Sequence, residues 1–129
     1  MCGFIGEYRL DSARADLAPL REARDVLRHR GPDSDGEFVS VNGRCAIAFC
    51  RLAIQDTSAA ADMPMTDDAS GTTLALNGEI YNHLDLRAAQ TARPFKTHSD
   101  AESLLAHFVA NPPADNPAAI EDVDGMFAF

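Results

Sequence analysis

Cys2 carries a thiol, which can act as a nucleophile, and it directly follows the initiator methionine in the stretch MCGFIGE. If Met1 is removed, Cys2 carries a free α-amine beside its own thiol. An α-amine titrates at about pH 7.7–8.0 and a cysteine thiol at about pH 8.5. One group can then act as the base for the other near neutral pH, as in N-terminal nucleophiles. Taken alone, Cys2 is better explained as a small residue tolerated at a frayed terminus.

Arg51 offers a partner for a carboxylate. It is the first residue of the stretch RLAIQD and directly follows the apolar run from Cys45 to Cys50. An unpaired guanidinium is costly to bury in such a strand. Either a carboxylate of the protein or the carboxylate of a ligand pairs with it. The fork of the guanidinium suits a ligand, because it binds carboxylates through two hydrogen bonds. The sequence leaves both partners open.

Asn77 and Gly78, in the stretch LNGEIYNH, could stabilise a developing negative charge. Asn-Gly after a strand is usually only a turn, and we expect a turn here. The Asn77 side-chain amide and the Gly78 backbone N–H could instead form an oxyanion hole. Glu79 then supplies a carboxylate at the same point of the chain.

Two further stretches have simple structural explanations. Ser99 and Glu102 match a helix-capping box, which leaves Asp100 only the general benefit of a negative charge at a helix start. An exposed Asp100 could instead hold a substrate ammonium group. In RHRGPDSDG, which contains Arg30 and Asp33, basic residues followed by Gly-Pro are typical of a helix end.

The remaining composition excludes other classes of function. The net charge of −9 argues against a nucleic-acid or anionic membrane surface. The four histidines show no metal-ligand spacing, so no metal site is expected. Three cysteines without a Cys-x-x-Cys pair favour a reducing, cytoplasmic location. Cys45 and Cys50 lie in an apolar run and are interpreted as inert core thiols.

The elements that must position these residues alternate between strands and helices. The 129 residues are about one domain, and an Asn42-Gly43 hairpin is expected between two strands. We expect a loop over 56–71 and a proline-rich linker from Asn111 to Pro117. The pattern predicts an α+β fold, with strands at 3–9, 37–41, 45–54, 72–76 and 125–129 and helices from Asp11 or Ser12 to Arg28, at 84–92 and at 99–110.

In this order, six stretches resemble the successive signatures of the class II glutamine amidotransferase domain: CGFIG, RHRGPDSDG, RLAIQD, LNGEIYNH, HSDAE and DVDGMFAF. Details of the second, fourth and last resemble the branch of glutamine-hydrolysing asparagine synthetases. The resemblance covers Cys2 to Phe129 and implies one amidotransferase domain over residues 1–129. It implies an N-terminal-nucleophile fold, a four-layer αββα sandwich with mainly antiparallel sheets. The family's domain is longer, and this chain stops inside an expected strand, so we expect a fragment truncated at its C-terminus.

The resemblance also implies catalytic roles. Cys2 would attack the side-chain amide of L-glutamine, with its α-amine as general base. Asn77 and Gly78 would stabilise the oxyanion of the tetrahedral intermediate. Arg51 would bind the α-carboxylate of the substrate.

Four further residues receive supporting roles from the same resemblance. Glu79, through its backbone, and Asp100 would hold the α-amino group of glutamine. Arg30 and Asp33 would mainly shape the site. The sequence departs from the family pattern at Cys50, where the family often has a histidine, and at Met63-Pro64-Met65, where it often has Gln-Pro-Met. These departures put the packing of the family's glutamine loop in question.

The implied activity is that of an ATP-dependent carbon–nitrogen ligase of asparagine biosynthesis, of which this chain carries the glutaminase half. A C-terminal synthetase domain, absent here, would use ATP and Mg²⁺ to activate aspartate. These residues contain neither a Ser-Gly-Gly-x-Asp-Ser loop nor a Walker motif, so no cofactor is expected in them. The alternatives are an amidotransferase with another acceptor, such as a peptide, a cell-surface molecule or a secondary metabolite, and a non-catalytic module. A homodimer stays open.

Overall fold

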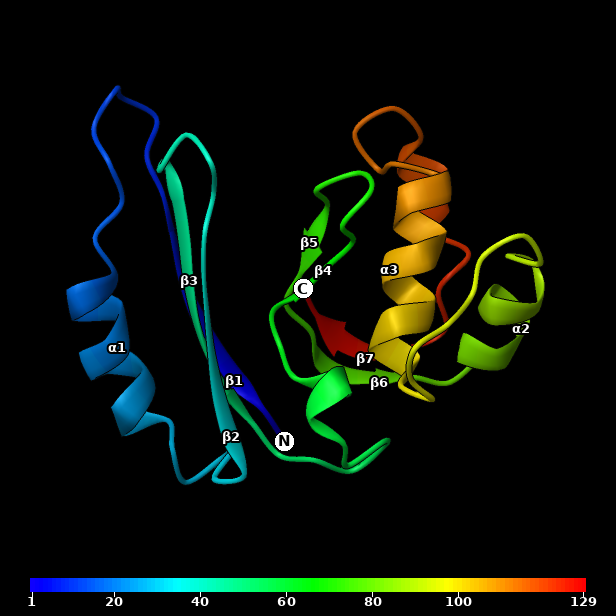
Figure 1. Ribbon diagram of the computed structural model, residues 1–129, viewed down its shortest axis with the longest axis horizontal. Coiled ribbons are helices and arrows are strands. Elements are labelled where there is room, and N and C mark those ends of the chain that lie inside the picture. Colours follow the sequence, from blue (N-terminus) through cyan, green and yellow to red (C-terminus); the bar gives the residue numbers. More distant parts are fainter. The chain divides into compact units, whose positions relative to one another are not determined.

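The computed structural model describes residues 1–129 as a mixture of helices and antiparallel sheets (Figure 1). The chain divides into two units. Unit 1 contains Met1–Ala53 and Asp62–Pro64, and unit 2 contains Ile54–Ala61 and Met65–Phe129. The predicted α+β class is confirmed. None of the helices is long and apolar enough to cross a membrane.

The sheet of unit 1 is formed by β1 (Gly3–Tyr8), β2 (Ser34–Val39) and β3 (Cys45–Arg51), in the order β1-β3-β2. Both outer strands run antiparallel to β3. The predicted hairpin between β2 and β3 is confirmed, and Gly43 has a φ of 71°, a conformation that glycine adopts at little cost.

Helix α1 (Leu17–Val26) covers one face of this sheet (Figure 1). The side chain of Leu20 packs against Ala46 and Ala48 of β3. The prediction that this helix starts at Asp11 or Ser12 is wrong. The Asp11 carboxylate pairs with Arg9 and accepts a hydrogen bond from the Ala13 N–H, which forms a local turn. The helix starts later, where Asp16 accepts a hydrogen bond from the Ala18 N–H at 2.9 Å.

Alternation along the strands separates two faces of this sheet. A Cβ on Gly3 would lie 3.1 Å from Leu27 beyond the end of α1, and Cys50 donates its S–H to the Leu27 carbonyl, so both face the helix side. Phe4 and Phe49 stack on the opposite face with ring centroids 6.2 Å apart. Arg51, two residues after Phe49, belongs to that second face.

Unit 2 contains two small antiparallel sheets. One pairs β4 (Met65–Thr66) with β5 (Thr73–Leu74), and the other pairs β6 (Asn77–Ile80) with β7 (Gly125–Ala128). The loop predicted for 56–71 therefore contains a strand, and also a 3₁₀ turn at Ala59–Ala61. The linker predicted from Asn111 ends in another 3₁₀ turn, Pro117–Ile120.

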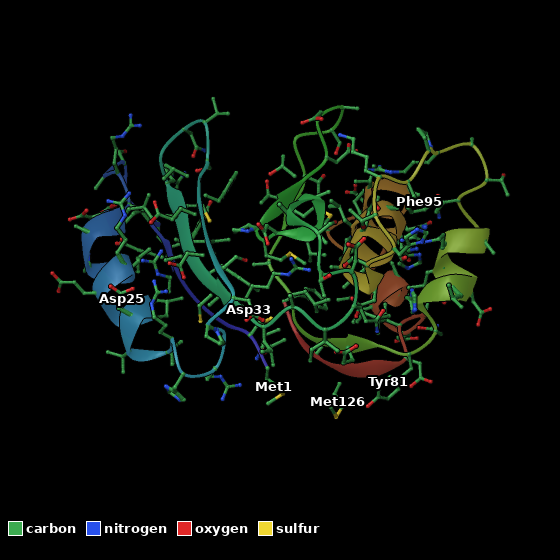
Figure 2. All side chains as sticks on the ribbon, turned by 60° about the horizontal axis from the view of Figure 1, so that its bottom comes forward. Met1, Asp25, Asp33, Tyr81, Phe95 and Met126 are labelled. Atoms are coloured by element: carbon green, nitrogen blue, oxygen red, sulfur yellow. The ribbon has the colours of Figure 1, made fainter.

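Helix α3 (Asp100–Ala110) is the centre of unit 2 and is buried along most of its length. It packs against α2 (His83–Ala88) and β6 (Figure 1). The predicted cap is present, because Ser99 Oγ accepts a hydrogen bond from the Ala101 N–H at 3.1 Å. On the face of the β6–β7 sheet that is turned away from α3, the side chain of Met126 of β7 is 57% exposed (Figure 2).

Candidate active site

The strand order of unit 1 brings three distant segments to one end of the sheet. Gly3 pairs with Cys50, and Ser34 pairs with Arg51. Because β1 and β2 both run antiparallel to β3, their first residues lie beside its last. Met1 and Asp33 therefore lie at this same end (Figure 2).

The Cys2 thiol contacts the backbone that follows β3. Its Sγ accepts the Leu52 N–H at 3.4 Å and lies 3.7 Å from the Leu52 carbonyl oxygen. Arg30 Nε donates a hydrogen bond to the Cys2 carbonyl oxygen at 3.1 Å, and this bond fixes the backbone of Cys2. The thiol is half-buried. Met1 is 59% exposed and joins the Cys2 nitrogen in a peptide bond, so the α-amine of Cys2 forms only when Met1 is cut away.

The turn from Gly31 to Asp33 supports the end of β3. A Cβ on Gly31 would lie 2.5 Å from the Cys50 carbonyl oxygen, so only glycine fits this approach. The Asp33 N–H donates to the Arg51 carbonyl at 2.9 Å, and its carboxylate accepts the Ala53 N–H at 2.8 Å. Helix α1 ends at Val26, close to the predicted end near Arg28, and Nδ1 of His29 lies 3.0 Å from the Val26 carbonyl oxygen. The residues from Gly31 to Asp33 then connect the helix end to β2.

Arg51 pairs with a carboxylate of the protein. Its side chain is 7% exposed, and Nη1 lies 2.8 Å from Oδ1 of Asp62. Ser34 Oγ donates to the same oxygen at 2.7 Å. Sequence reasoning missed Asp62. The available signal was that Asp62 is the one acidic residue between Thr57 and Pro64, close after an arginine that needs a partner.

Asn77 and Gly78 lie in strand β6, and the predicted turn at these residues is wrong. Gly78 pairs with Phe127 of β7. A Cβ on Gly78 would lie 2.1 Å from the Met126 carbonyl oxygen, so the glycine is required by close strand packing. The side-chain oxygen of Asn77 is buried and has no hydrogen-bond partner. The Asn77 amide is therefore not fully used in holding the fold.

Both acidic residues of the predicted site bind groups of unit 2. Glu79 Oε2 accepts a hydrogen bond from Gln55 Nε2 at 2.7 Å. Asp100 is buried and not exposed: Oδ2 accepts the Ile80 N–H and Oδ1 the Ala101 N–H, both at 2.9 Å. Asp100 thus joins α3 to β6. A carboxylate has about four acceptor positions, so these two bonds leave capacity for an ammonium group.

Arg87 and Glu102 support the segment before α3, and sequence reasoning missed both roles. Arg87 donates to the Thr97 carbonyl at 2.7 Å and to the Ser99 carbonyl at 2.9 Å. Glu102 accepts the N–H groups of Lys96 at 2.8 Å and of Thr97 at 2.7 Å. Glu102 therefore does not return to Ser99 as in the predicted reciprocal capping box. It fixes the turn that leads to the cap.

Two pKa shifts accompany these contacts. Burial raises the pKa of the Cys50 thiol, in agreement with an inert core cysteine. Hydrogen bonds from the Ser58 hydroxyl and from the backbone N–H groups of His98 and Ser58 lower the pKa of Asp56 to about 2. Asp56 therefore stays ionised while it holds the chain next to His98.

The predicted site residues thus form two groups. Unit 1 brings together Cys2, Arg30, Asp33 and Arg51, and unit 2 brings together Asn77, Gly78, Glu79 and Asp100. The first group presents a thiol and a guanidinium. The second presents an amide, a strand N–H and two carboxylates.

Comparison with known proteins identifies a family for this arrangement. The model of a family described as "Glutamine amidotransferase domain" matches residues 1–129. Asparagine synthetase B (glutamine-hydrolysing) of Escherichia coli K12 is 37% identical over 131 residues, covering 100% of this chain and 22% of that protein. The corresponding enzymes of Triphysaria versicolor and of Pisum sativum root are each 35% identical over 130 residues, covering 100% of this chain and 21% of each protein. The chain spans about a fifth of the length of these relatives.

Proposed function

Because the chain belongs to the family of glutamine amidotransferase domains, we propose that it hydrolyses the side-chain amide of L-glutamine with Cys2 as the nucleophile. The observation that carries the proposal is the end of the sheet in unit 1. There the thiol that follows Met1 lies beside the backbone next to Arg51. A thiol just before β1 and a guanidinium at the end of the neighbouring strand β3 suit an attack on the side chain of an amino acid.

The reaction proceeds in two steps. After removal of Met1, the α-amine of Cys2 takes the thiol proton, and the sulfur attacks the amide carbon. The carbon–nitrogen bond breaks, ammonia leaves with the transferred proton, and a γ-glutamyl thioester forms. Water then attacks the thioester, the carbon–sulfur bond breaks, and glutamate and the free thiol are released.

Each charge of glutamine has a partner in this proposal. Arg51 binds the α-carboxylate, while the Asn77 amide and the Gly78 N–H stabilise the oxyanion. The Glu79 backbone and the Asp100 carboxylate hold the α-ammonium group. Arg30 and Asp33 keep the chain around Cys2 and Arg51 in place through their backbone contacts.

The names of the relatives support a larger proposal for the full protein. Those relatives are called glutamine-hydrolysing asparagine synthetases. We propose that the ammonia serves the amidation of aspartate by a C-terminal synthetase domain with ATP and Mg²⁺, in asparagine biosynthesis in the cytoplasm. We also propose that the complete domain of the full protein forms the four-layer αββα sandwich of N-terminal nucleophiles.

Mass spectrometry and labelling test the nucleophile. The purified full chain should lack Met1, and a diazoketone analogue of glutamine should label Cys2 only in the protein without Met1. Cys2→Ala should reduce ammonia release from glutamine to the rate without protein. Cys45→Ala is the matched control, since Cys45 lies at the opposite end of β3, and it should retain activity. Ammonia release that survives Cys2→Ala would exclude the mechanism.

A further inference from the structure

Arg51, which our proposed function assigns to the substrate α-carboxylate, already holds a carboxylate of the chain. We propose that Asp62 occupies this clamp and competes with the α-carboxylate of glutamine, so that Asp62 sets both the affinity and the selectivity for that group. This inference rests on the proposed function. It identifies Asp62 as a specificity-determining residue.

The position of Asp62 is fixed by the sheet of unit 1. Ser34 is the residue of β2 that pairs with Arg51, and its hydroxyl donates to the Asp62 oxygen that Arg51 also contacts. Met63, the residue after Asp62, packs directly on β2, since a Cβ on Gly36 of β2 would lie 1.7 Å from the Met63 carbonyl oxygen. Asp62 is therefore placed at the guanidinium by the Ser34 hydroxyl and by the packing of Met63 on β2, and not by charge attraction alone.

The two partners differ in their access to water. The Arg51 side chain is 7% exposed, whereas the Asp62 side chain is 36% exposed. A buried guanidinium needs a partner at all times, because leaving it unpaired is costly. Asp62 supplies that partner before substrate binds. It can give up Arg51 at lower cost, because its own carboxylate can turn to water.

Competition follows from the charges. A second carboxylate on the same guanidinium leaves the group with a net negative charge, and the two carboxylates repel each other. The α-carboxylate of glutamine must therefore displace Asp62 from Nη1 or bind beside it against repulsion. A ligand without an α-carboxylate does not make this exchange, so Asp62 weakens the binding of glutamine and leaves the binding of amides without this charge unchanged.

The variant Asp62→Asn tests the proposal in the full chain. Asparagine keeps an oxygen for Ser34 and Arg51 but removes the charge. The KM for glutamine should fall about tenfold, the effect of one charge-assisted hydrogen bond, with kcat within about twofold of the parent. The KM for the α-amide of glutamine, which has no α-carboxylate, should not fall. Asp68→Asn removes the same charge from a side chain that is 86% exposed and should change neither value.

A second readout separates this inference from the catalytic proposal. Glutamine binding is measured by calorimetry in Cys2→Ala, with and without Asp62→Asn. An unchanged or raised KM and Kd in Asp62→Asn would overturn the role of Asp62, even if Cys2 proves catalytic. A tenfold lower Kd, together with a parent protein that keeps Cys2 and still does not hydrolyse glutamine, would support Asp62 and overturn the catalytic proposal. Absence of both binding and hydrolysis would overturn both.

Ser34→Ala provides a check that does not alter Asp62 itself. Without the Ser34 hydroxyl, Asp62 is held less firmly at Arg51. The KM for glutamine should fall in the same direction as in Asp62→Asn, but by less. A rise in KM with unchanged thermal stability would contradict competition, because it would show that the anchored Asp62 assists substrate binding.

Discussion

The two units hold their charged side chains in different ways. In unit 1, the ion pairs around β2 and β3 join side chain to side chain: Arg21 with Glu37, Arg28 with Asp35 and Arg51 with Asp62. In unit 2, the charged groups around the start of α3 bind mainly the backbone: Arg87, Asp100 and Glu102 contact carbonyl or N–H groups. Charged residues of the same types therefore pair with one another in unit 1 and bind the backbone in unit 2.

The difference has a physical consequence. A pair of side chains can exchange one partner for a ligand without moving the backbone. A side chain that binds backbone groups fixes the path of the chain, and losing it leaves those groups unpaired. We therefore expect changes in the pairs of unit 1 to alter substrate affinity, and changes in the network of unit 2 to alter stability and geometry.

The largest effect is expected at Asn77 of unit 2, whose side-chain oxygen, unlike the charged groups around the start of α3, binds no backbone group. The Asn77 side-chain oxygen is buried without a hydrogen-bond partner, so truncating the side chain breaks no hydrogen bond to that oxygen. Asn77→Ala should lower kcat about 100- to 1,000-fold, as expected for loss of one oxyanion donor, with little change in thermal stability. Steady-state ammonia release and thermal unfolding measure the two effects. Asn116→Ala, which removes an exposed amide without a capping hydrogen bond, should change neither. A large loss of stability in Asn77→Ala would show that the amide serves the fold.

Arg87→Met tests the backbone network directly. The variant leaves the Thr97 and Ser99 carbonyls without their guanidinium partner. Each buried unpaired group costs about 1–3 kcal/mol, so the free energy of unfolding in urea should fall by at least about 2 kcal/mol. Arg28→Met breaks exposed pairs in unit 1 and should cost less than about 1 kcal/mol. Equal losses in the two variants would contradict the comparison.

The smallest effect concerns pH and Asp56. Its pKa is lowered from 3.8 to about 2, first by the Ser58 hydroxyl and then by the His98 N–H. A lowered pKa in the folded state means that the ionised carboxylate stabilises the fold above pH 3.8, and that this contribution is lost as the pH falls towards about 2. Asp56→Asn accepts the same backbone conformation, with φ at 54°. The stability difference from the parent should therefore be constant near neutral pH, change as the pH falls from 3.8 through about 2, and level off below that.

Urea unfolding at a series of pH values measures this window. Ser58→Ala removes the largest cause of the shift and should narrow the window without abolishing it. A stability difference with the same value below pH 2 as at neutral pH would show that the Asp56 charge does not contribute through its titration.

Local chemistry was enough to predict several elements. Helix α3 begins at its Ser99 cap, because capping depends on neighbouring residues alone. Helix α2 also starts directly after Asn82, near the predicted position, although the Asn82 side chain makes no capping hydrogen bond. The hairpin at Asn42-Gly43 is equally local. The same reasoning failed at Asn77-Gly78, since the partner strand β7 lies far along the chain and pairing overrides a local turn preference.

The sequence by itself determined the chemical types of the site: a thiol after Met1, a guanidinium, an amide beside a glycine, and two acidic residues, in an order that identifies the family. Only the tertiary structure decided their partners. It paired Arg51 with Asp62, buried Asp100 against β6 and made Arg87 a support of the backbone. Residue type sets which interactions a side chain can make, whereas the partner depends on contacts that form only when distant segments pack together.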